Sequence, residues 1–190
     1  MNVFNKIILI IALAFAIGTS VFGDQSDFYN RTRGDEQWGV SVGFGNNHKI
    51  PRHTLVPHME FSVTTFEFEH FISQRTSIGF DLSLIERTNR VDNDAISTSA
   101  NYTRYFYIHD RFSINYKFGL GIVHMQELVQ GQASRTNFDE HLDLGFQYAT
   151  NSSSSISLAF TLYHASNAGI KQPNDGITAT LVQLGYRWRR

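Results

Sequence analysis

Apolar and polar residues alternate with a period of two along most of the chain from residue 37 onward. The clearest example runs from Phe112 to Ile122, where apolar residues at even positions alternate with serine, asparagine, lysine and glycine at odd positions. Successive side chains of a β-strand point to opposite faces, so this alternation indicates strands rather than helices. The pattern predicts eight strands, at residues 37–45, 56–71, 76–87, 95–108, 112–126, 137–150, 155–166 and 177–189.

The second predicted strand is less regular than the others. Its apolar positions change parity between Val63 and Phe66. An extra residue in one strand of an antiparallel pair produces such a change, so we expect a β-bulge near Thr64 and Thr65.

The predicted connections between strands alternate in length. Those at 72–75, 109–111 and 151–154 are short, whereas those at 46–55, 88–94, 127–136 and 167–176 are longer. Outer-membrane barrels have this asymmetry, with tight turns on one side of the membrane and long loops on the other. The sequence therefore predicts an all-β fold, an eight-stranded antiparallel transmembrane β-barrel.

The direction of the apolar face separates this fold from a soluble one. A secreted β-sandwich or lipocalin-like barrel would point its apolar face inward, whereas a small membrane barrel points it toward lipid. Aromatic residues near the strand ends favour the membrane barrel: Trp38, Tyr105, Phe106, Tyr107, Tyr186 and Trp188. We therefore expect Phe118, Phe160 and Leu184 on the outside of the barrel.

The first 23 residues have the features of an export signal. Lys6 is followed by an unbroken apolar stretch of 11 residues, Ile7–Ile17, which is too short to span a bilayer as a helix. We expect a signal peptide at residues 1–23, cleaved after Gly23, and a barrel domain at 24–190. A short buried helix is the alternative interpretation of this stretch.

Composition narrows the chemistry that the chain can perform. There is no cysteine, which excludes disulfides, zinc–thiolate sites, iron–sulfur clusters and a cysteine nucleophile. The formal net charge is −1, which argues against nucleic acid as a partner. Eight strands enclose an interior that side chains just fill, so a pore is not expected.

One strand carries a pair of residues suited to catalysis. In the strand 155–166 the even positions are apolar up to Leu162 and then become His164 and Ser166. Residues i and i+2 of a strand point the same way, with Cα atoms about 6.5–7 Å apart, so the imidazole can reach and activate the hydroxyl. The alternative is a strand end that emerges among lipid headgroups, where both residue types are commonplace.

The stretch that begins with this pair, His164–Gly176 (HASNAGIKQPNDG), closely resembles the signature of the PagL-type outer-membrane lipid A 3-O-deacylases. A weaker likeness extends over the barrel, including Asn137, Phe138 and the Gly119–Gly121 segment. The resemblance implies an eight-stranded barrel in the Gram-negative outer membrane that hydrolyses the acyl ester at the 3 position of lipid A.

The resemblance also implies roles for individual residues. His164 corresponds to the general base and Ser166 to the nucleophile, and Asn167 and Asn174 match asparagines that help to bind the oxyanion. The family works without a metal ion, and no other cofactor is implied. The implied substrate is lipid A in lipopolysaccharide, and a homodimer is one candidate oligomeric state.

The sequence departs from the family at the triad acid. The family has a glutamate where this chain has Thr178, which cannot supply a negative charge to an imidazolium. If the turn at 151–154 is centred near residue 152, Glu140 lies opposite His164 and could serve as the acid. Asp175 in the adjoining loop is a second candidate, and an ordinary solvated role for Glu140 is the alternative.

Two further functions stay open at this stage. One is a catalytically silent or weakened structural barrel of the same lineage, with Thr178 marking the lost acid. The other is a secreted soluble β-barrel that binds a small apolar ligand. The first long connection carries His48, Lys49, Arg52 and His53, which could meet lipid A phosphates or form a solvated basic loop.

Overall fold

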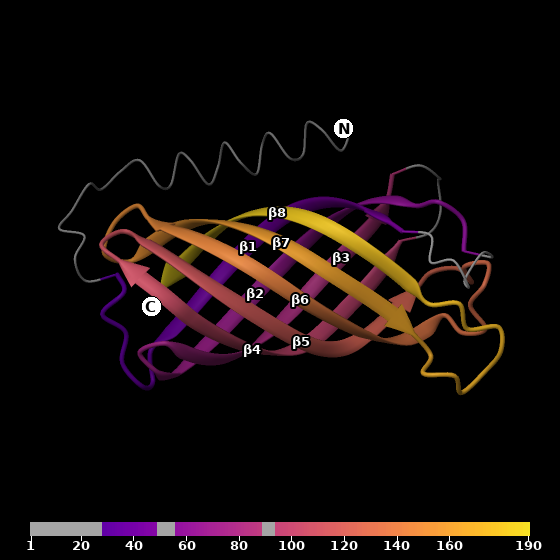
Figure 1. Ribbon diagram of the computed structural model, residues 1–190, viewed down its shortest axis with the longest axis horizontal. Helices are drawn as coiled ribbons and strands as arrows, with labels where there is room; N and C mark the ends of the chain where they lie inside the picture. The colour runs from indigo at the N-terminus through magenta and orange to yellow at the C-terminus, as the bar shows by residue number, and fades with distance from the viewer. Residues whose placement is uncertain (1–27, 49–55, 89–93) are drawn as a thin grey trace.

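The structure, a computed structural model, describes residues 28–48, 56–88 and 94–190, and eight antiparallel strands in these ranges form a closed barrel (Figure 1). The strands are β1 (Glu36–Asn47), β2 (Glu60–Ser73), β3 (Thr76–Arg87), β4 (Ala95–His109), β5 (Phe112–Met125), β6 (Thr136–Ala149), β7 (Ser154–Ser166) and β8 (Ile177–Arg189). The predicted strand bounds agree to within two residues, except that β2 begins at Glu60 rather than at residue 56.

Each strand pairs with its neighbour in sequence, and β1 pairs with β8 to close the barrel. An open sheet edge in hydrocarbon would leave backbone groups unpaired, at a cost of several kcal/mol each. Closure removes that cost, and the fold is the eight-stranded transmembrane β-barrel that the alternation predicts. The signal peptide expected at residues 1–23 lies outside the described residues.

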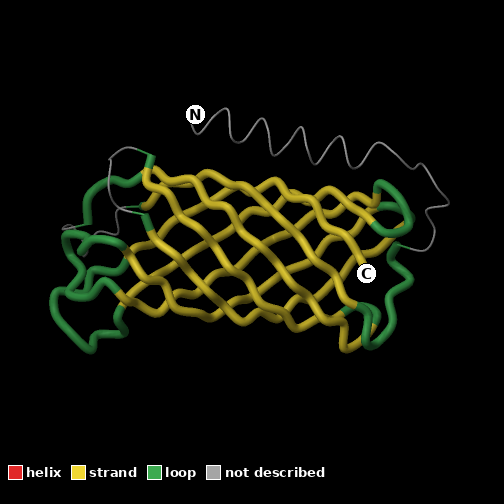
Figure 2. The backbone as a smooth tube through the Cα atoms, turned by 180° about the vertical axis from the view of Figure 1, so that it is seen from behind, coloured by secondary structure: helices red, strands yellow, loops and turns green. Residues whose placement is uncertain are grey.

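The strand connections differ in length between the two ends of the barrel, as predicted. Tight turns join β2 to β3, β4 to β5 and β6 to β7 at one end, hereafter the short-turn end. The remaining connections are longer and gather at the opposite end, hereafter the long-loop end (Figure 2). Within the described ranges, no helix is long and apolar enough to cross a membrane.

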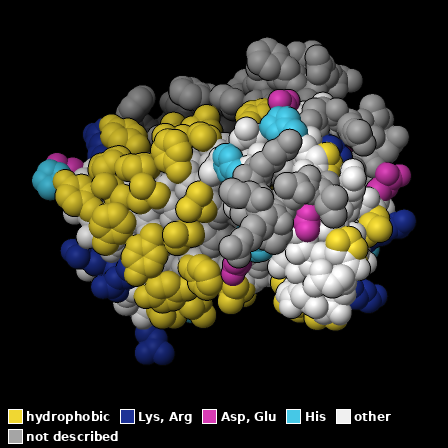
Figure 3. Space-filling view, turned by 45° about the vertical axis from the view of Figure 1, so that its right-hand side comes forward, with side chains coloured by type: hydrophobic (Ala, Val, Ile, Leu, Met, Phe, Trp, Pro, Cys, Tyr) yellow, Lys and Arg dark blue, Asp and Glu magenta, His cyan; other side chains and the backbone are white. Residues whose placement is uncertain are grey.

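The apolar face of the sheet is the outside of the barrel. Phe118, Phe160 and Leu184 are 43%, 48% and 43% exposed, as the membrane orientation requires. Apolar side chains cover much of the wall in Figure 3, whereas polar side chains are frequent toward the long-loop end. The interpretation as a soluble barrel that buries its apolar face is therefore wrong.

Buried ion pairs fill the middle of the barrel. Lys117 Nζ lies 2.7 Å from Asp81, 3.2 Å from Glu67 and 3.4 Å from Asp143. A second cation, Arg187, pairs with Glu67 and with Glu69, and Tyr105 donates a hydrogen bond to Glu69. These groups are shielded from water, so each charge depends on its partners for stability.

Toward the long-loop end the interior becomes apolar, which the alternation alone did not predict. The buried members of this apolar cluster are Val56, Met59, Val123, Met125, Val129, Ala165 and Ile177. Val63, on β2, points inward and is buried. Its register with β1 is continuous through Thr64 and Thr65, so the bulge expected there is wrong. The apolar positions of β2 seem to change parity because Val63 is apolar although it points into the barrel.

The structure places β-bulges elsewhere. The β2–β3 register shifts between Phe71 and Ser73, and the β4–β5 register shifts between Tyr105 and Tyr107. As a result Phe106 and Tyr107 are both exposed, whereas Tyr105 is fully buried inside the barrel. Tyr105, one of the strand-end aromatic residues that favoured a membrane barrel in the sequence, therefore lies inside the barrel and does not face lipid.

The segment before β1 fills the short-turn end of the barrel. The Arg31 guanidinium is buried against four aromatic rings, the nearest being Tyr105 at 4.1 Å and Phe71 at 4.5 Å. It donates hydrogen bonds to the side chains of Gln37 and Gln147. Burial of the neighbouring Tyr29 raises the pKa of its phenol. This end of the interior is therefore closed by packed side chains.

Candidate active site

His164 and Ser166 lie on the outer face of β7, where the strand reaches the long-loop end. Both side chains are half-buried, and Leu162, the next outward residue below them, is 58% exposed. On β6, Phe138 lies opposite Ser166 and is also exposed. The predicted pair therefore sits on the lipid-facing wall, above a stripe of apolar side chains.

His164 is held by the neighbouring strand β8. Its Nδ1 atom lies 2.9 Å from the Thr178 hydroxyl, and the two residues are directly paired across β7 and β8. Thr178 thus occupies the position from which an acid would orient the imidazole. A hydroxyl can accept a hydrogen bond from the ring, but it supplies no charge.

Gly176 makes room for the imidazole. A Cβ atom built at this position would lie 2.6 Å from His164 Cε1, and the backbone has φ of +66°, a left-handed conformation. A larger residue would therefore be strained and would displace the ring. This gives a physical reason for a glycine at the end of the His164–Gly176 stretch.

Glu140 lies opposite His164 on β6, as the predicted register required. Its side chain is exposed on the outer face, so His164 is flanked by Glu140 on one side and by Thr178 on the other. Directly opposed Cβ atoms are about 4.5–5.5 Å apart in an antiparallel pair. Among the residues that the structure describes, the His164 ring hydrogen-bonds to Thr178 and not to Glu140.

The Ser166 hydroxyl is oriented by the loop that follows it. The Ala168 N–H donates to Ser166 Oγ over 3.4 Å, and Ala168 adopts a left-handed conformation with φ of +54°. Ser166 and His164 point the same way but are not hydrogen-bonded to each other in the described structure.

The two predicted asparagines hold this loop together. The backbone N–H of Asn167 donates to Asn174 Oδ1 over 3.0 Å, and Asn167 Nδ2 donates to the carbonyl of Lys171 over 3.0 Å. Asp175, the second acid candidate, donates its backbone N–H to the Gly131 carbonyl in the β5–β6 loop. The loop is thus fixed both internally and against its neighbour.

One residue beside the site could not be identified from the strand pattern. The His48 ring hydrogen-bonds to Thr180, with Nε2 2.8 Å from Oγ1, and its backbone N–H donates to the Thr178 carbonyl over 2.7 Å. The sequence grouped His48 with Lys49, Arg52 and His53 as a loop, and those three residues lie outside the described ranges. His48 itself continues β1 and lies against β8.

A shallow groove lies on the outer wall below the site. It has a volume of about 470 Å³, and its lining includes Tyr116, Leu142, Leu144, Phe160, Leu162 and Val182. These residues come from β5 to β8, the strands that also flank His164 and Ser166. The lining of the groove reaches Leu162, the outward residue next to His164 on β7.

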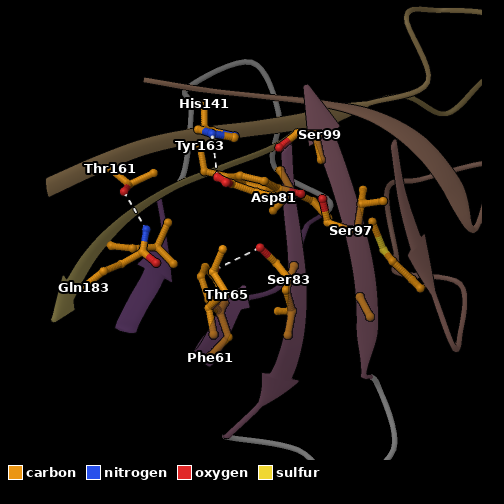
Figure 4. Close-up of a pocket in the computed structure, with 18 of the residues that line it drawn as sticks. Phe61, Thr65, Asp81, Ser83, Ser97, Ser99, His141, Thr161, Tyr163 and Gln183 are labelled. Atoms are coloured by element: carbon orange, nitrogen blue, oxygen red, sulfur yellow. Dashed lines mark hydrogen bonds and ion pairs between the residues drawn. The ribbon is translucent and has the colours of Figure 1, made fainter. Parts of the chain in front are cut away.

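A separate cavity of about 100 Å³ lies inside the barrel (Figure 4). Its lining changes from the apolar cluster to polar side chains, including Asp81, His141 and Tyr163. Across it, Gln183 donates a hydrogen bond to Thr161. The cavity lies on the inner face of the sheet, so the wall separates it from the outward-facing pair.

A known protein family matches the part of the chain that contains His164 and Ser166. The family model described as lipid A 3-O-deacylase (PagL) matches residues 118–187, from within β5 to near the end of β8. This match confirms the resemblance seen in the His164–Gly176 stretch. No curated protein matches the chain.

Several solved structures share the fold. The crystal structure of the outer membrane enzyme PagL is 17% identical, with a TM-score of 0.59, and the match covers 79% of this chain and 98% of that one. Neisserial surface protein A is 9% identical, with a TM-score of 0.64 and coverage of 80% and 96%. The N-terminal β-barrel domain of Pseudomonas aeruginosa OprF is 8% identical, with a TM-score of 0.53 and coverage of 80% and 97%.

Proposed function

We propose that this barrel is a lipid A 3-O-deacylase of the outer membrane, a carboxylic ester hydrolase of the serine–histidine type. The observation that carries the proposal is the position of His164 and Ser166 on the lipid-facing wall, directly above an apolar groove. A membrane lipid can reach such a site by lateral diffusion, with its acyl chain against the wall and its ester near the headgroup boundary. The family match supports the same substrate class.

In the proposed reaction Ser166 attacks the carbonyl carbon of the ester while its proton moves to His164 Nε2. This requires the tautomer in which Nδ1 carries the other proton, and the Thr178 hydroxyl 2.9 Å from Nδ1 can accept a hydrogen bond from that proton. The imidazolium then protonates the sugar oxygen as the C–O bond breaks. Water hydrolyses the acyl-serine in a second step and releases the free fatty acid.

The negative charge on the carbonyl oxygen needs a hydrogen-bond donor. The Ala168 N–H is the donor that already contacts Ser166 Oγ, so we assign it to the oxyanion. Asn167 and Asn174 then contribute by holding the loop in the conformation that presents this N–H. Their own amides are additional candidates for the same role.

Glu140 is proposed as the group that supplies negative charge to the imidazolium. It is the carboxylate directly opposite His164, and its exposure lets the side chain change rotamer toward the ring. Thr178 orients the ring by a neutral hydrogen bond, and Glu140 stabilises the charge that develops. Glu140→Gln separates these two contributions, because it keeps the shape and removes the charge.

The test uses the purified barrel in vesicles that contain lipopolysaccharide. Wild type is expected to release a free 3-hydroxy fatty acid, whereas Ser166→Ala and His164→Ala are not. Both variants keep the barrel intact if they migrate as the folded form in unheated gels.

A silent barrel of the same lineage is the second candidate function. The presence of threonine in place of the family acid favours it, because within the described ranges the hydrogen bond of the His164 ring goes to a neutral hydroxyl and not to a carboxylate. In this case wild type and Ser166→Ala would release equally little fatty acid.

A further inference from the structure

In the described part of the chain, three histidines on the outer face of the barrel each hydrogen-bond to a threonine on an adjacent strand at the long-loop end. The ring-nitrogen to hydroxyl distances are 2.8 to 2.9 Å in the pairs His124–Thr136, His164–Thr178 and His48–Thr180. Two of these pairs meet on β8, where the threonines are two residues apart and point the same way. The start of β8 is therefore flanked by a histidine on each side.

His48 makes two contacts with this part of β8. Its backbone N–H donates to the Thr178 carbonyl over 2.7 Å, one residue beyond the end of β1 at Asn47. Its ring nitrogen Nε2 lies 2.8 Å from Thr180 Oγ1. The ring contact therefore fixes His48, whose backbone adds one more hydrogen bond to the pairing of β1 with β8.

The end of β1, directly before His48, is held by hydrogen bonds of its own. The buried Asn47 side chain donates to the carbonyl of Pro57 over 2.9 Å and accepts from the Met59 N–H over 2.8 Å. Asn47 is held by these bonds and pairs with Ala179 on β8. Because His48 is the next residue along the chain, its ring also lies beside β8.

We infer that His48 is a positioning residue for the proposed reaction: it holds the start of β8 so that the Thr178 hydroxyl stays within hydrogen-bond reach of His164 Nδ1. The inference rests on the proposed function. Thr178 is only the second residue of β8, directly after the 167–176 loop. On the side away from β7, the bond that holds its carbonyl comes from His48.

His48 acts through Thr178 and does not touch the reacting atoms. Two strand spacings, about 10 Å, separate it from His164 across β8. It also lies outside the matched residues 118–187, so the N-terminal strand supplies a part of the site that the family match does not cover. Loss of its ring should therefore alter the rate of the chemical step and leave substrate binding nearly unchanged.

The test compares His48→Leu with His48→Gln in the vesicle assay. Gln can place an amide nitrogen where Nε2 lies and keep the contact with Thr180, whereas Leu fills similar space without a polar atom. We expect His48→Leu to lower kcat about threefold to tenfold, the range that corresponds to one lost hydrogen bond, and to leave KM unchanged. His48→Gln should retain most of the wild-type kcat.

His124→Leu is the matched control, because it removes a histidine–threonine pair of the same kind on β5 and β6. It should leave kcat unchanged. An unchanged kcat in His48→Leu, an equal loss in His124→Leu, or a failure of His48→Gln to restore the rate would each overturn the inference.

A second measurement does not depend on activity. Nitrogen-15 NMR of the His164 ring in folded, lipid-reconstituted protein reports whether Nδ1 is protonated and hydrogen-bonded. We expect His48→Leu to shift these resonances and His124→Leu to leave them in place, whereas unshifted resonances in His48→Leu contradict the inference. If wild type releases no fatty acid, the proposed function fails, and the NMR comparison still decides the role of His48.

Discussion

Replacing Thr178 with glutamate should make the proposed enzyme faster. The Thr178 hydroxyl lies 2.9 Å from His164 Nδ1, so the position already faces the ring nitrogen that an acid would contact. The side chain is half-buried on the outer wall, where a longer residue can extend toward the headgroups without entering the barrel. Thr178→Glu therefore adds a negative charge next to the imidazole without requiring a new backbone position.

The size of the effect follows from the change in the hydrogen bond. A neutral hydrogen bond contributes about 0.5–1.5 kcal/mol and one to a charged group about 1.5–3 kcal/mol, a difference of about 1–1.5 kcal/mol. Each ~1.4 kcal/mol changes a rate tenfold, so the expected gain is about tenfold. The imidazole becomes charged only as it accepts the Ser166 proton, so the gain should appear in kcat and not in KM.

The assay is release of 3-hydroxy fatty acid from lipopolysaccharide in vesicles, run in the native and the Glu140→Gln backgrounds. If Glu140 already stabilises the imidazolium, Glu140→Gln lowers kcat, and adding Thr178→Glu to that variant restores it. Thr178→Val, which keeps the shape but loses the hydroxyl, should lower kcat. A Thr178→Glu variant that folds but gives no gain in either background would show that a negative charge at this position does not stabilise the imidazolium.

Three further substitutions test the geometry of the site, the interior and the orientation of the wall. Gly176→Ala should displace the His164 ring and lower kcat by about tenfold to a hundredfold, whereas Gly169→Ala, which has a similar left-handed φ of +76° but nothing within 4 Å of its added Cβ, should lower kcat less. Lys117→Met leaves three buried carboxylates without their shared cation and should lower the free energy of unfolding by about 3–5 kcal/mol in a urea titration in vesicles; an unchanged midpoint would show that the ion pairs are dispensable. Phe160→Arg, on the outer wall halfway along β7, should cost about 2–4 kcal/mol in the same titration, and a neutral effect would contradict its contact with lipid.

The strand pattern was sufficient to predict much of the fold and the register at the site. Alternation identified the strands because one face of each is almost continuously apolar. The short turn after β6 then fixed the pairing of Glu140 with His164. In an antiparallel pair, residues at equal distances from the turn lie opposite each other. Thr178 was identified through the resemblance to the family, whereas its hydrogen bond to His164 required side-chain geometry.

Features of the interior could not be predicted in this way. Lys117 and Glu67 are 50 residues apart and meet across the barrel, and alternation says only that both point inward. The inward position of Val63 imitated a bulge because a small barrel can have apolar side chains inside as well as outside. Tyr105 points inward in step with Thr103 on β4, and the bulge that follows turns Tyr107, which has the same parity, to the outer face.

The most direct test of the central claim is mass spectrometry of lipid A from Gram-negative cells that express the wild-type chain or Ser166→Ala. Both proteins should reach the outer membrane in equal amounts. We expect lipid A to lose one 3-hydroxyacyl chain, from the 3 position, only in cells with the wild-type chain. Identical lipid A in the two strains, with both barrels folded in the membrane, would contradict it.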